Sequence, residues 1–442
     1  MRIGSSSFIK AVVVAIVALL LLIPVQLLRN LVNERAQLRE QAVASVSRGW
    51  GGRQLLGGPV IAIPATVAAD ESRLTPLDWY VLPDSLELEA ELVVQQERRK
   101  LGVYEVPVYL TKIHAIGKFD LAARIAAMNA AQSGVTLHLD RARLLLPVSD
   151  ARGVRDVKLN GAGLVAGTFE PERGFPVAVI GAPLRTDIDF QKGTTTFDVS
   201  LDIAGTESLQ FMPLARSTSV RLTGNWAHPG FTRGFLPTAR EIKDDRFSAR
   251  WQILDLNRVY PSQWFQHETL QASLEESAFG VDLVQPVDLY QQAERSVKYA
   301  GLFIALSLLT LFLWEHLAGE SLHPIQYGLM GLALSVFYLL LLALAEHIGF
   351  GKAYVAAALA LCSLLGVYIS GAFKSAKAGG GSAVAFAIVY ALLYLLVTAE
   401  DYSLLAGAIG LFVILATVMV VTRKIDWYQP GAKSAGDGPA SL

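Results

Sequence analysis

The chain has 442 residues, of which 52% are hydrophobic and only 17% are charged, whereas a soluble domain usually carries about 25% charged residues. This deficit indicates a membrane protein, and the near balance of 38 basic and 39 acidic residues excludes a nucleic-acid binder that works through a basic surface. The single cysteine, Cys362, excludes an intramolecular disulfide and a cysteine-rich zinc site. Residues 29–296 hold 61 of the 77 charges, which separates a polar domain from an apolar membrane part.

The first predicted element is a transmembrane helix over residues 8–28, a run whose only charge is Lys10. About 20 apolar residues, at about 1.5 Å each, cross a hydrocarbon core of about 30 Å. A cleaved signal peptide is the alternative, but its apolar region is about 7–15 residues long and a small-residue cleavage site follows it. Here the run is longer and Gln26-Leu27-Leu28-Arg29-Asn30 ends it. Residues 1–28 are therefore expected to be an uncleaved signal anchor.

A large domain is expected over residues 29–296, with a helical lead-in at residues 30–47 where apolar residues recur at helical spacing. Short runs of apolar residues, most of them alternating with polar ones, then predict strands. These runs are residues 60–63, 86–92, 135–139 and 196–203. Asn160-Gly161 between two short apolar runs predicts a hairpin, and residues 120–131 predict a short helix. The domain is therefore predicted to be mostly antiparallel β, as a sandwich or as two packed subdomains.

This domain carries no motif of a nucleophilic, phosphate-binding or zinc-binding site. Its four histidines are scattered without the spacing of metal ligands, so no metal is expected. They are His114, His138, His228 and His267. The tryptophans Trp79, Trp226, Trp251 and Trp264 are interpreted as core aromatics of a β domain.

Five further transmembrane helices are predicted in residues 297–425, which brings the count to six. They cover residues 298–314, 324–345, 353–373, 383–399 and 402–422. Lys and Arg near the helix ends favour an N-terminus in the cytoplasm, because the inner flanks then carry most of the basic residues. The C-terminus is then also cytoplasmic and the large domain extracytoplasmic. Residues 426–442, rich in Gly, Pro and Ser, are predicted to be a disordered tail.

The middle of these helices contains no acidic or basic residue, which argues against a proton-coupled transporter. Polar residues such as Ser307, Thr310, Ser335, Tyr338 and Tyr390 are expected to form hydrogen bonds between helices.

Charged residues instead collect at the two ends of the helices. We call the set at the predicted outer face the interfacial collar: Arg295, Lys298, Glu346, His347, Lys352, Glu400 and Asp401. The set at the predicted inner face is the inner-edge polar site: Glu315, His316, His323 and Tyr327. Because an unpaired acid at a partly dry boundary is unfavourable, Glu346 or Glu400 is expected to pair with a basic residue. Glu315 is expected to contact the segment 323–327, with snorkelling to the surface as the alternative.

Ordered stretches along nearly the whole chain resemble the CreD family of bacterial inner-membrane proteins, a family linked to cell-envelope integrity. They include Ile23-Pro24-Val25, Val32-Asn33-Glu34-Arg35, Gly57-Gly58-Pro59, Phe247-Ser248-Ala249-Arg250-Trp251, His323-Pro324-Ile325-Gln326-Tyr327 and Glu346-His347-Ile348-Gly349-Phe350. The resemblance implies a bacterial inner membrane, a periplasmic domain, an association with a two-component regulatory system and a role in envelope stress. It implies no catalytic residue.

The sequence therefore predicts a six-span α-helical membrane protein with a large extracytoplasmic β domain. We expect it to maintain the cell envelope, or to serve the envelope stress response, by binding an envelope component without catalysis. The expected partners are the lipid bilayer and an envelope protein or lipid, with no nucleic acid and no cofactor. A transporter or lipid-handling protein is the alternative, and a cavity between the helices would favour it. An envelope enzyme is a further alternative, which a cleft with a convergent acid, base and nucleophile would favour.

Overall fold

The structure is a computed structural model that describes most of the chain. It covers residues 4–70, 73–95, 99–101, 104–131, 134–160, 166–185, 194–231, 234–266, 269–284, 289–318 and 322–398, and seven single positions between 405 and 420. Contacts divide the chain into two compact units. The helical unit comprises Met1–Leu38 and Val287–Leu442, and the β unit comprises Arg39–Pro286.

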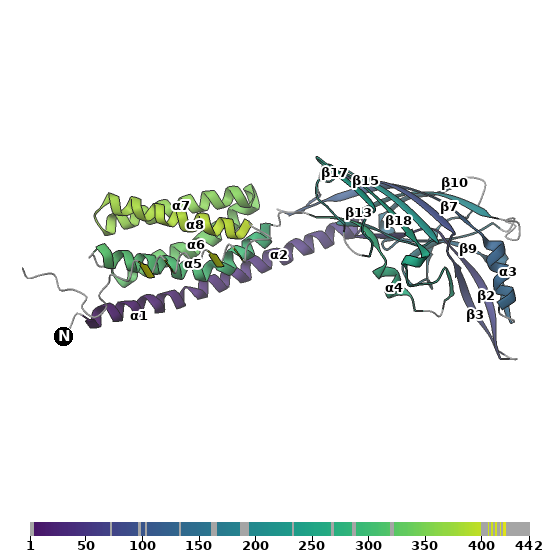
Figure 1. Cartoon of the computed structure of the whole chain (residues 1–442), viewed down its shortest axis with the longest axis horizontal. Helices are drawn as coiled ribbons and strands as arrows, with labels where there is room; N and C mark the ends of the chain where they lie inside the picture. The colour runs from purple at the N-terminus through teal and green to yellow at the C-terminus, as the bar shows by residue number, and fades with distance from the viewer. Residues whose placement is uncertain are drawn as a thin grey trace, which may run out of the picture. The chain divides into compact units, whose positions relative to one another are not determined.

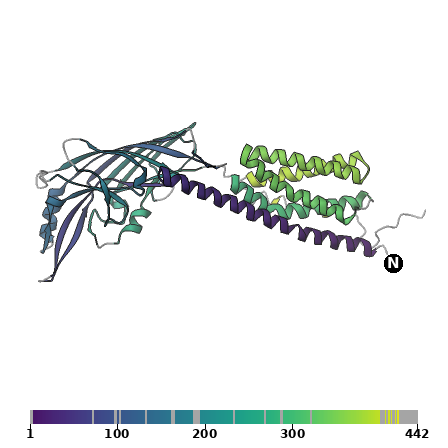
Figure 2. The ribbon, with the colours of Figure 1, turned by 180° about the vertical axis from the view of Figure 1, so that it is seen from behind.

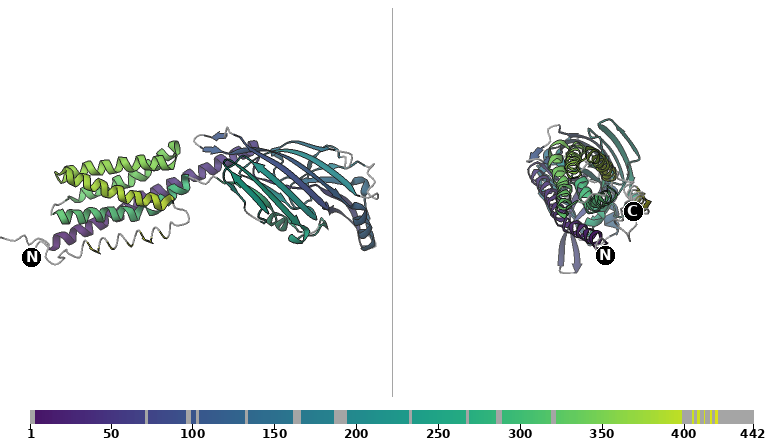
Figure 3. Two further views of the ribbon diagram at one scale, coloured as in Figure 1. Left: turned by 45° about the horizontal axis from the view of Figure 1, so that its top comes forward. Right: turned by 90° about the vertical axis from the view of Figure 1, so that its left-hand side faces the viewer.

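The helical unit is a bundle of long apolar helices that lie side by side (Figures 1 and 3). Its helices are α1 (Gly4–Leu20), the first part of α2 (Leu22–Trp50), α5 (Leu289–Ala318), α6 (Pro324–Ile348), α7 (Phe350–Ala372) and α8 (Ala376–Thr398). A single turn residue, Leu21, separates α1 from α2, and the run of both helices can be followed in Figure 2. Within the described residues, five helices are long and apolar enough to cross a membrane.

These five helices correspond to the first five predicted spans. The sixth predicted span, residues 402–422, lies outside the described residues except for single positions, and so does the tail at residues 426–442. The predicted domain boundary after residue 296 falls inside α5, which begins at Leu289. The predicted helical lead-in at residues 30–47 is part of α2, which ends at Trp50 just before Gly51 adopts a positive φ.

Close packing in the helical unit depends on glycines. Leu21 lies against Gly331 of α6, where an added Cβ would be 2.1 Å from Leu21 Cδ1. Between α7 and α8, an added Cβ on Gly379 would be 2.5 Å from the carbonyl oxygen of Gly366. Helices in a membrane associate mainly through van der Waals contact, so small residues that let two backbones approach stabilise the bundle.

The surface of the bundle is apolar, and many large hydrophobic side chains point outward. Examples are Leu27, Ile325, Leu359, Val367, Ile388 and Leu395. The same helices also bury apolar side chains against one another, such as Leu28, Val32 and Leu334. A helix bundle with a hydrophobic interior and a hydrophobic exterior is typical of a protein solvated by lipid.

The β unit contains two seven-stranded sheets. The order in sheet C is β10 (Val154–Asn160), β13 (Thr195–Thr206), β7 (Val108–Phe119), β4 (Ser85–Val94), β15 (Ser217–Gly224), β18 (Arg246–Leu254) and β17 (Ala239–Lys243). The order in sheet B is β11 (Glu170–Glu172), β12 (Val179–Pro183), β9 (Arg143–Pro147), β2 (Val60–Asp70), β3 (Arg73–Val81) and β19 (Gln263–Phe265), with β8 (Val135–Leu137) paired to β2.

Two smaller sheets, the end of α2 and two short α-helices also belong to the β unit. The small sheets are β1 (Gln54–Gly57), β14 (Ser208–Met212), β20 (Phe279–Leu283) and β16 (Pro229–Gly230), and the pair β5 (Arg99–Leu101) and β6 (Tyr104–Val106). The helices are α3 (Leu121–Ala131) and α4 (Gln271–Glu276). Among the described strand pairs only β1 with β14 and β4 with β15 are parallel. The prediction of a mostly antiparallel domain is therefore confirmed.

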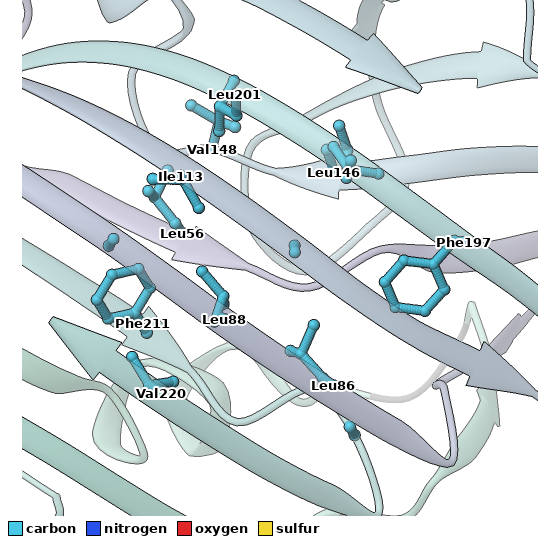
Figure 4. Packing of buried hydrophobic residues seen from close by; sticks show 14 of the residues in the cluster. Leu56, Leu86, Leu88, Ile113, Leu146, Val148, Phe197, Leu201, Phe211 and Val220 are labelled. Carbon is cyan, nitrogen blue, oxygen red and sulfur yellow. The ribbon is translucent and has the colours of Figure 1, made fainter. Parts of the chain in front are cut away.

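One hydrophobic core lies between the two large sheets. On β4 the side chains alternate, so that Leu86 and Leu88 point inward while Glu87 and Glu89 point outward. The inward side chains join one buried cluster with residues of sheet B such as Leu146 (Figure 4). The β unit is thus built on two sheets packed face to face, which agrees with the predicted sandwich.

The individual strand predictions are confirmed at residues 60–63, 86–92 and 196–203, and the helix predicted at residues 120–131 is α3. The strand predicted at residues 135–139 is shorter, because Leu139 begins a 3-10 turn. Asn160 ends β10, whose described neighbour is β13, and residues 161–165 lie outside the described residues together with the predicted hairpin. Trp79, Trp251 and Trp264 are buried as predicted, whereas Trp226 is half-buried.

Candidate functional site

The collar residue Glu346, at the C-terminal end of α6, holds together three helices. Its Oε1 accepts a hydrogen bond of 3.1 Å from the Tyr290 hydroxyl of α5. Arg35 of α2 places its Nε 3.8 Å from the same oxygen. The Glu346 side chain is only 9% exposed, so its charge needs these partners. The expected pairing of Glu346 with a basic residue is confirmed.

The basic partner is not one of the residues predicted for the collar. Arg295 is half-buried, Lys298, His347 and Lys352 are exposed, and Glu400 and Asp401 lie outside the described residues. Sequence reasoning missed Arg35 and Tyr290. A signal for Arg35 is present in the helical spacing, because Leu28, Val32 and Arg35 are four and three residues apart and share one face of α2. Leu28 and Val32 are buried in the helical unit, so the same face carries Arg35 to Glu346.

The inner-edge residues lie where α5 ends and α6 begins. The Tyr327 hydroxyl donates a hydrogen bond of 2.5 Å to Glu315 Oε2, and the two residues are 2% and 6% exposed. This is the predicted contact of Glu315 with the segment 323–327. His323 is exposed and caps α6, where its Nδ1 accepts from the Ile325 N–H at 3.3 Å. The side chain of His316 lies outside the described residues.

The two acids mark opposite ends of the α5–α6 pair. Tyr290 and Glu346 meet at the start of α5 and the end of α6, whereas Glu315 and Tyr327 meet at the other ends. From Tyr327 to Glu346, α6 rises about 28 Å, since each residue adds about 1.5 Å. A hydrocarbon core is about 30 Å thick. Each buried acid therefore sits about where the helices would leave the membrane.

Most of the described polar side chains inside the bundle do not form the expected hydrogen bonds between helices. Thr310 and Ser335 donate to carbonyl oxygens four residues earlier on their own helices, at 2.8 Å and 3.1 Å. A Ser or Thr hydroxyl reaches that carbonyl without any partner helix, and this local bond replaces the predicted one. Among the described residues, the hydroxyls of Ser307, Tyr338 and Tyr390 are buried and have no hydrogen-bond partner. Between α7 and α8, the Tyr354 hydroxyl donates a hydrogen bond of 2.6 Å to the Tyr390 carbonyl oxygen.

In the β unit, the outer face of sheet C is exposed and carries charges of both signs. Arg221 of β15 donates to Glu89 of β4 at 3.2 Å, and His114 of β7 lies 2.9 Å from Asp198 of β13. Hydrogen bonds from Asn160 and His114 lower the pKa of Asp198 below its usual range, although desolvation opposes them. These strands form an open depression of about 400 Å³. Its lining includes Glu89, Glu91, Lys112, His114, Asp202 and Arg221.

The sequence did not reveal this charged face. The alternation at residues 86–92 predicted only a strand. The cross-strand register brings the charges together, because Glu89 is opposite both His114 and Arg221. Among the described residues there is no group of three or more His, Cys, Asp or Glu side chains that could hold a metal ion. His138 lies instead beside Thr66, with 2.8 Å between Nε2 and Oγ1.

The fold and these sites define the class: a polytopic α-helical membrane protein with a large, mostly antiparallel β domain. A family model described as "Inner membrane protein CreD" matches residues 6–428. The inner membrane protein CreD of Escherichia coli (strain K12) is 34% identical over 426 residues, which cover 93% of this chain and 91% of that protein. The chain belongs to the CreD family of inner membrane proteins, as the resemblance of its sequence indicated.

Proposed function

We propose that this protein uses the outer face of sheet C, outside the cytoplasm, to bind a polar component of the cell envelope, without catalysis, and so helps to maintain the envelope. The observation that carries the proposal is the exposed grid of charges around Glu89, His114 and Arg221. A face that pairs acids with bases across strands can exchange these internal pairs for pairs with a partner. Such exchange is easy because exposed ion pairs contribute little to stability, typically about 0–1 kcal/mol.

The proposed topology has six spans, with both termini in the cytoplasm and the β unit in the periplasm. Basic residues support it, because Lys374 follows α7 and Lys377 lies in the first turn of α8, on the side of the bundle where the N-terminal helix begins. A reporter that is active only in the periplasm is fused after residue 200 and, separately, after residue 442. Activity at residue 200 and silence at residue 442 are expected. The reverse pattern would show that the orientation is wrong.

The binding proposal is tested by charge reversal on the sheet. Arg221→Glu is compared with Arg240→Glu, an exposed residue of the edge strand β17 that does not line the depression. Each variant is expressed in a strain that lacks the protein, and envelope permeability is measured by uptake of a fluorescent dye. We expect Arg221→Glu to fail to restore the barrier and Arg240→Glu to restore it, with equal amounts of both proteins in the membrane. Equal restoration by both variants would remove sheet C from the proposed function.

A further inference from the structure

A second polar cluster lies on sheet B, on the face that points away from the sandwich core. Arg143 of β9 donates through Nη2 to Asp78 Oδ2 at 2.6 Å. The Nη1 of the same guanidinium lies 3.3 Å from Glu172 Oε2 of β11. The three side chains are 27%, 16% and 20% exposed, so water screens them only in part. Two carboxylates share one guanidinium, and the triad keeps one negative charge.

Glycines make room for this cluster. The Glu172 carboxyl lies over Gly181 of β12, where an added Cβ would be 2.5 Å from Glu172 Cδ. Gly174, at φ +106°, brings its backbone close to the Gln266 amide and the Tyr80 hydroxyl; an added Cβ would be 2.6 Å and 3.3 Å from them. Side chains larger than hydrogen at either position would push into the polar groups. The arrangement is therefore built into the backbone and does not depend on mobile surface side chains.

The buried hydroxyl of Tyr80 is a second, independent indication that this cluster binds a ligand. It is two residues from Asp78 on β3, so both side chains are on the same face of the sheet. Tyr80 is 1% exposed, and its hydroxyl has no hydrogen-bond partner among the described residues. Burial raises the pKa of Tyr80, and the charges of Asp78 and Glu172 add to this while Arg143 opposes it. Buried hydroxyls are nearly always hydrogen-bonded, so this one calls for a partner beside the carboxylates.

The electrostatics of the site favour a positive partner. Burial raises the pKa of Glu172, and although Arg143 opposes this, repulsion from Asp78 adds to it. A cation beside the two carboxylates would relieve that repulsion. Aromatic rings also border the cluster: Phe175 and Trp264 lie 5.1 Å and 5.8 Å from Tyr80 between ring centroids. Aromatic faces add to the attraction of a cation.

We propose that the cluster of Asp78, Glu172 and Tyr80 binds a primary ammonium group. An ammonium group has three N–H donors and no acceptor. Two carboxylates and one phenolic oxygen supply three acceptors, and the single residual negative charge matches a single positive charge. Primary ammonium groups occur on ethanolamine lipid headgroups and on soluble amines or peptides. This site lies on the other sheet from the face that carries the proposed function, and neither proposal depends on the other.

The test uses the full chain in detergent and matched probes. Ethylammonium chloride carries the three donors, whereas tetramethylammonium chloride carries the same charge without any N–H. Binding is followed by titration calorimetry and by the midpoint of thermal unfolding. A parallel arm places the protein in vesicles of phosphatidylethanolamine or of phosphatidylcholine, whose headgroups differ in the same donors. Binding of soluble ethylammonium identifies a soluble source, and stabilisation only by phosphatidylethanolamine identifies a lipid headgroup.

Three variants decide whether the named residues are responsible. Tyr80→Phe is expected to weaken the response to the ammonium probe about tenfold, and Glu172→Gln is expected to abolish it. Glu241→Gln, an exposed acid on the edge strand β17, is the control and should leave the response unchanged. The proposal is overturned if both ammonium probes act alike or if neither arm responds. It is also overturned if Tyr80→Phe raises the unfolding temperature and leaves binding intact, since the triad would then be structural.

Discussion

The carboxylate of Glu346 joins α2, α5 and α6 at one end of the helical unit, so its charge should contribute to stability. We predict that Glu346→Gln lowers the free energy of unfolding by about 1 kcal/mol; the estimate is modest because Arg35 is 41% exposed. Lys352→Gln, at an exposed residue of α7, is the control and should have no effect. A thermal unfolding midpoint that is unchanged in Glu346→Gln, together with a lost envelope phenotype, would instead make this acid part of a binding site.

Glu315 should depend on its tyrosine partner more strongly, because both residues are nearly excluded from solvent. Tyr327→Phe removes the donor at 2.5 Å and leaves the carboxylate in place. We predict a loss of about 1–3 kcal/mol, the usual effect of taking a donor from a buried acceptor. The thermal midpoint in detergent measures it, with Tyr299→Phe on α5 as the matched change. Equal midpoints for the two variants would mean that the hydrogen bond from Tyr327 to Glu315 adds no stability and that Glu315 is only the end of a helix.

In the β unit, Asp150 ties the residues that follow α2 to the sandwich. Its carboxylate accepts from the Gly52 N–H at 2.9 Å and from Arg152 Nε at 2.8 Å. Burial would raise the pKa of Asp150, but hydrogen bonds from Arg152 and from the Gly52 N–H outweigh it and lower the pKa.

A lowered pKa in the folded state means that the carboxylate stabilises the fold above the unfolded pKa of about 3.9. The contribution is lost as pH falls through the lower folded pKa. We therefore predict that Asp150→Asn is less stable than the native chain by about 1 kcal/mol at neutral pH. The gap should close in strong acid, and unfolding midpoints measured across that range check it. A gap that stays constant with pH would show that the charge of Asp150 has no part in it.

Between α7 and α8, Gly366 and Gly379 let the two backbones approach closely. Gly379→Ala would place a methyl group 2.5 Å from the Gly366 carbonyl oxygen, so the two backbones must separate. We predict a loss of about 1–3 kcal/mol, typical of overpacking. Gly380→Ala is the neighbouring control, since nothing lies within 4 Å of its added Cβ. It should be neutral or stabilising by up to about 1 kcal/mol, the helix propensity of Ala over Gly. Thermal unfolding that ranks the two variants in reverse would contradict this packing.

For the whole molecule, the N-terminal helix is a component of the bundle, which bears on whether it is cleaved. Leu21, Leu28 and Val32 are buried, and Leu21 fills the space beside Gly331 of α6. Removal of residues 8–28 would delete the buried Leu21 and Leu28 and expose Gly331 of α6. We predict that the mature protein keeps residues 8–28. Edman sequencing or intact-mass measurement of purified protein checks this, and a first residue beyond Leu28 would refute it.

Elements that depend on local composition can be predicted from the amino-acid sequence. A long apolar run in lipid must pair its backbone N–H and C=O groups internally, which a helix does. The alternation of apolar and acidic residues along β4 lets a strand bury one face. Both elements were therefore predictable. The presence of an acid at each end of the α5–α6 pair was predictable for the same reason, since the apolar length between these charges matches a hydrocarbon core.

Which side chains meet across the chain depends on the tertiary structure. Arg35 and Tyr290 reach Glu346 because the α2 face that buries Val32 packs beside α5 and α6. Helical spacing places Arg35 on that face, but no spacing in the sequence relates it to Tyr290 or Glu346. The cluster of Asp78, Arg143 and Glu172 comes from three strands whose order in sheet B does not follow the chain. Hydrogen bonds and ion pairs act over a few ångströms, so partners far apart in sequence are set by strand order and helix packing, which the local pattern of side chains does not encode.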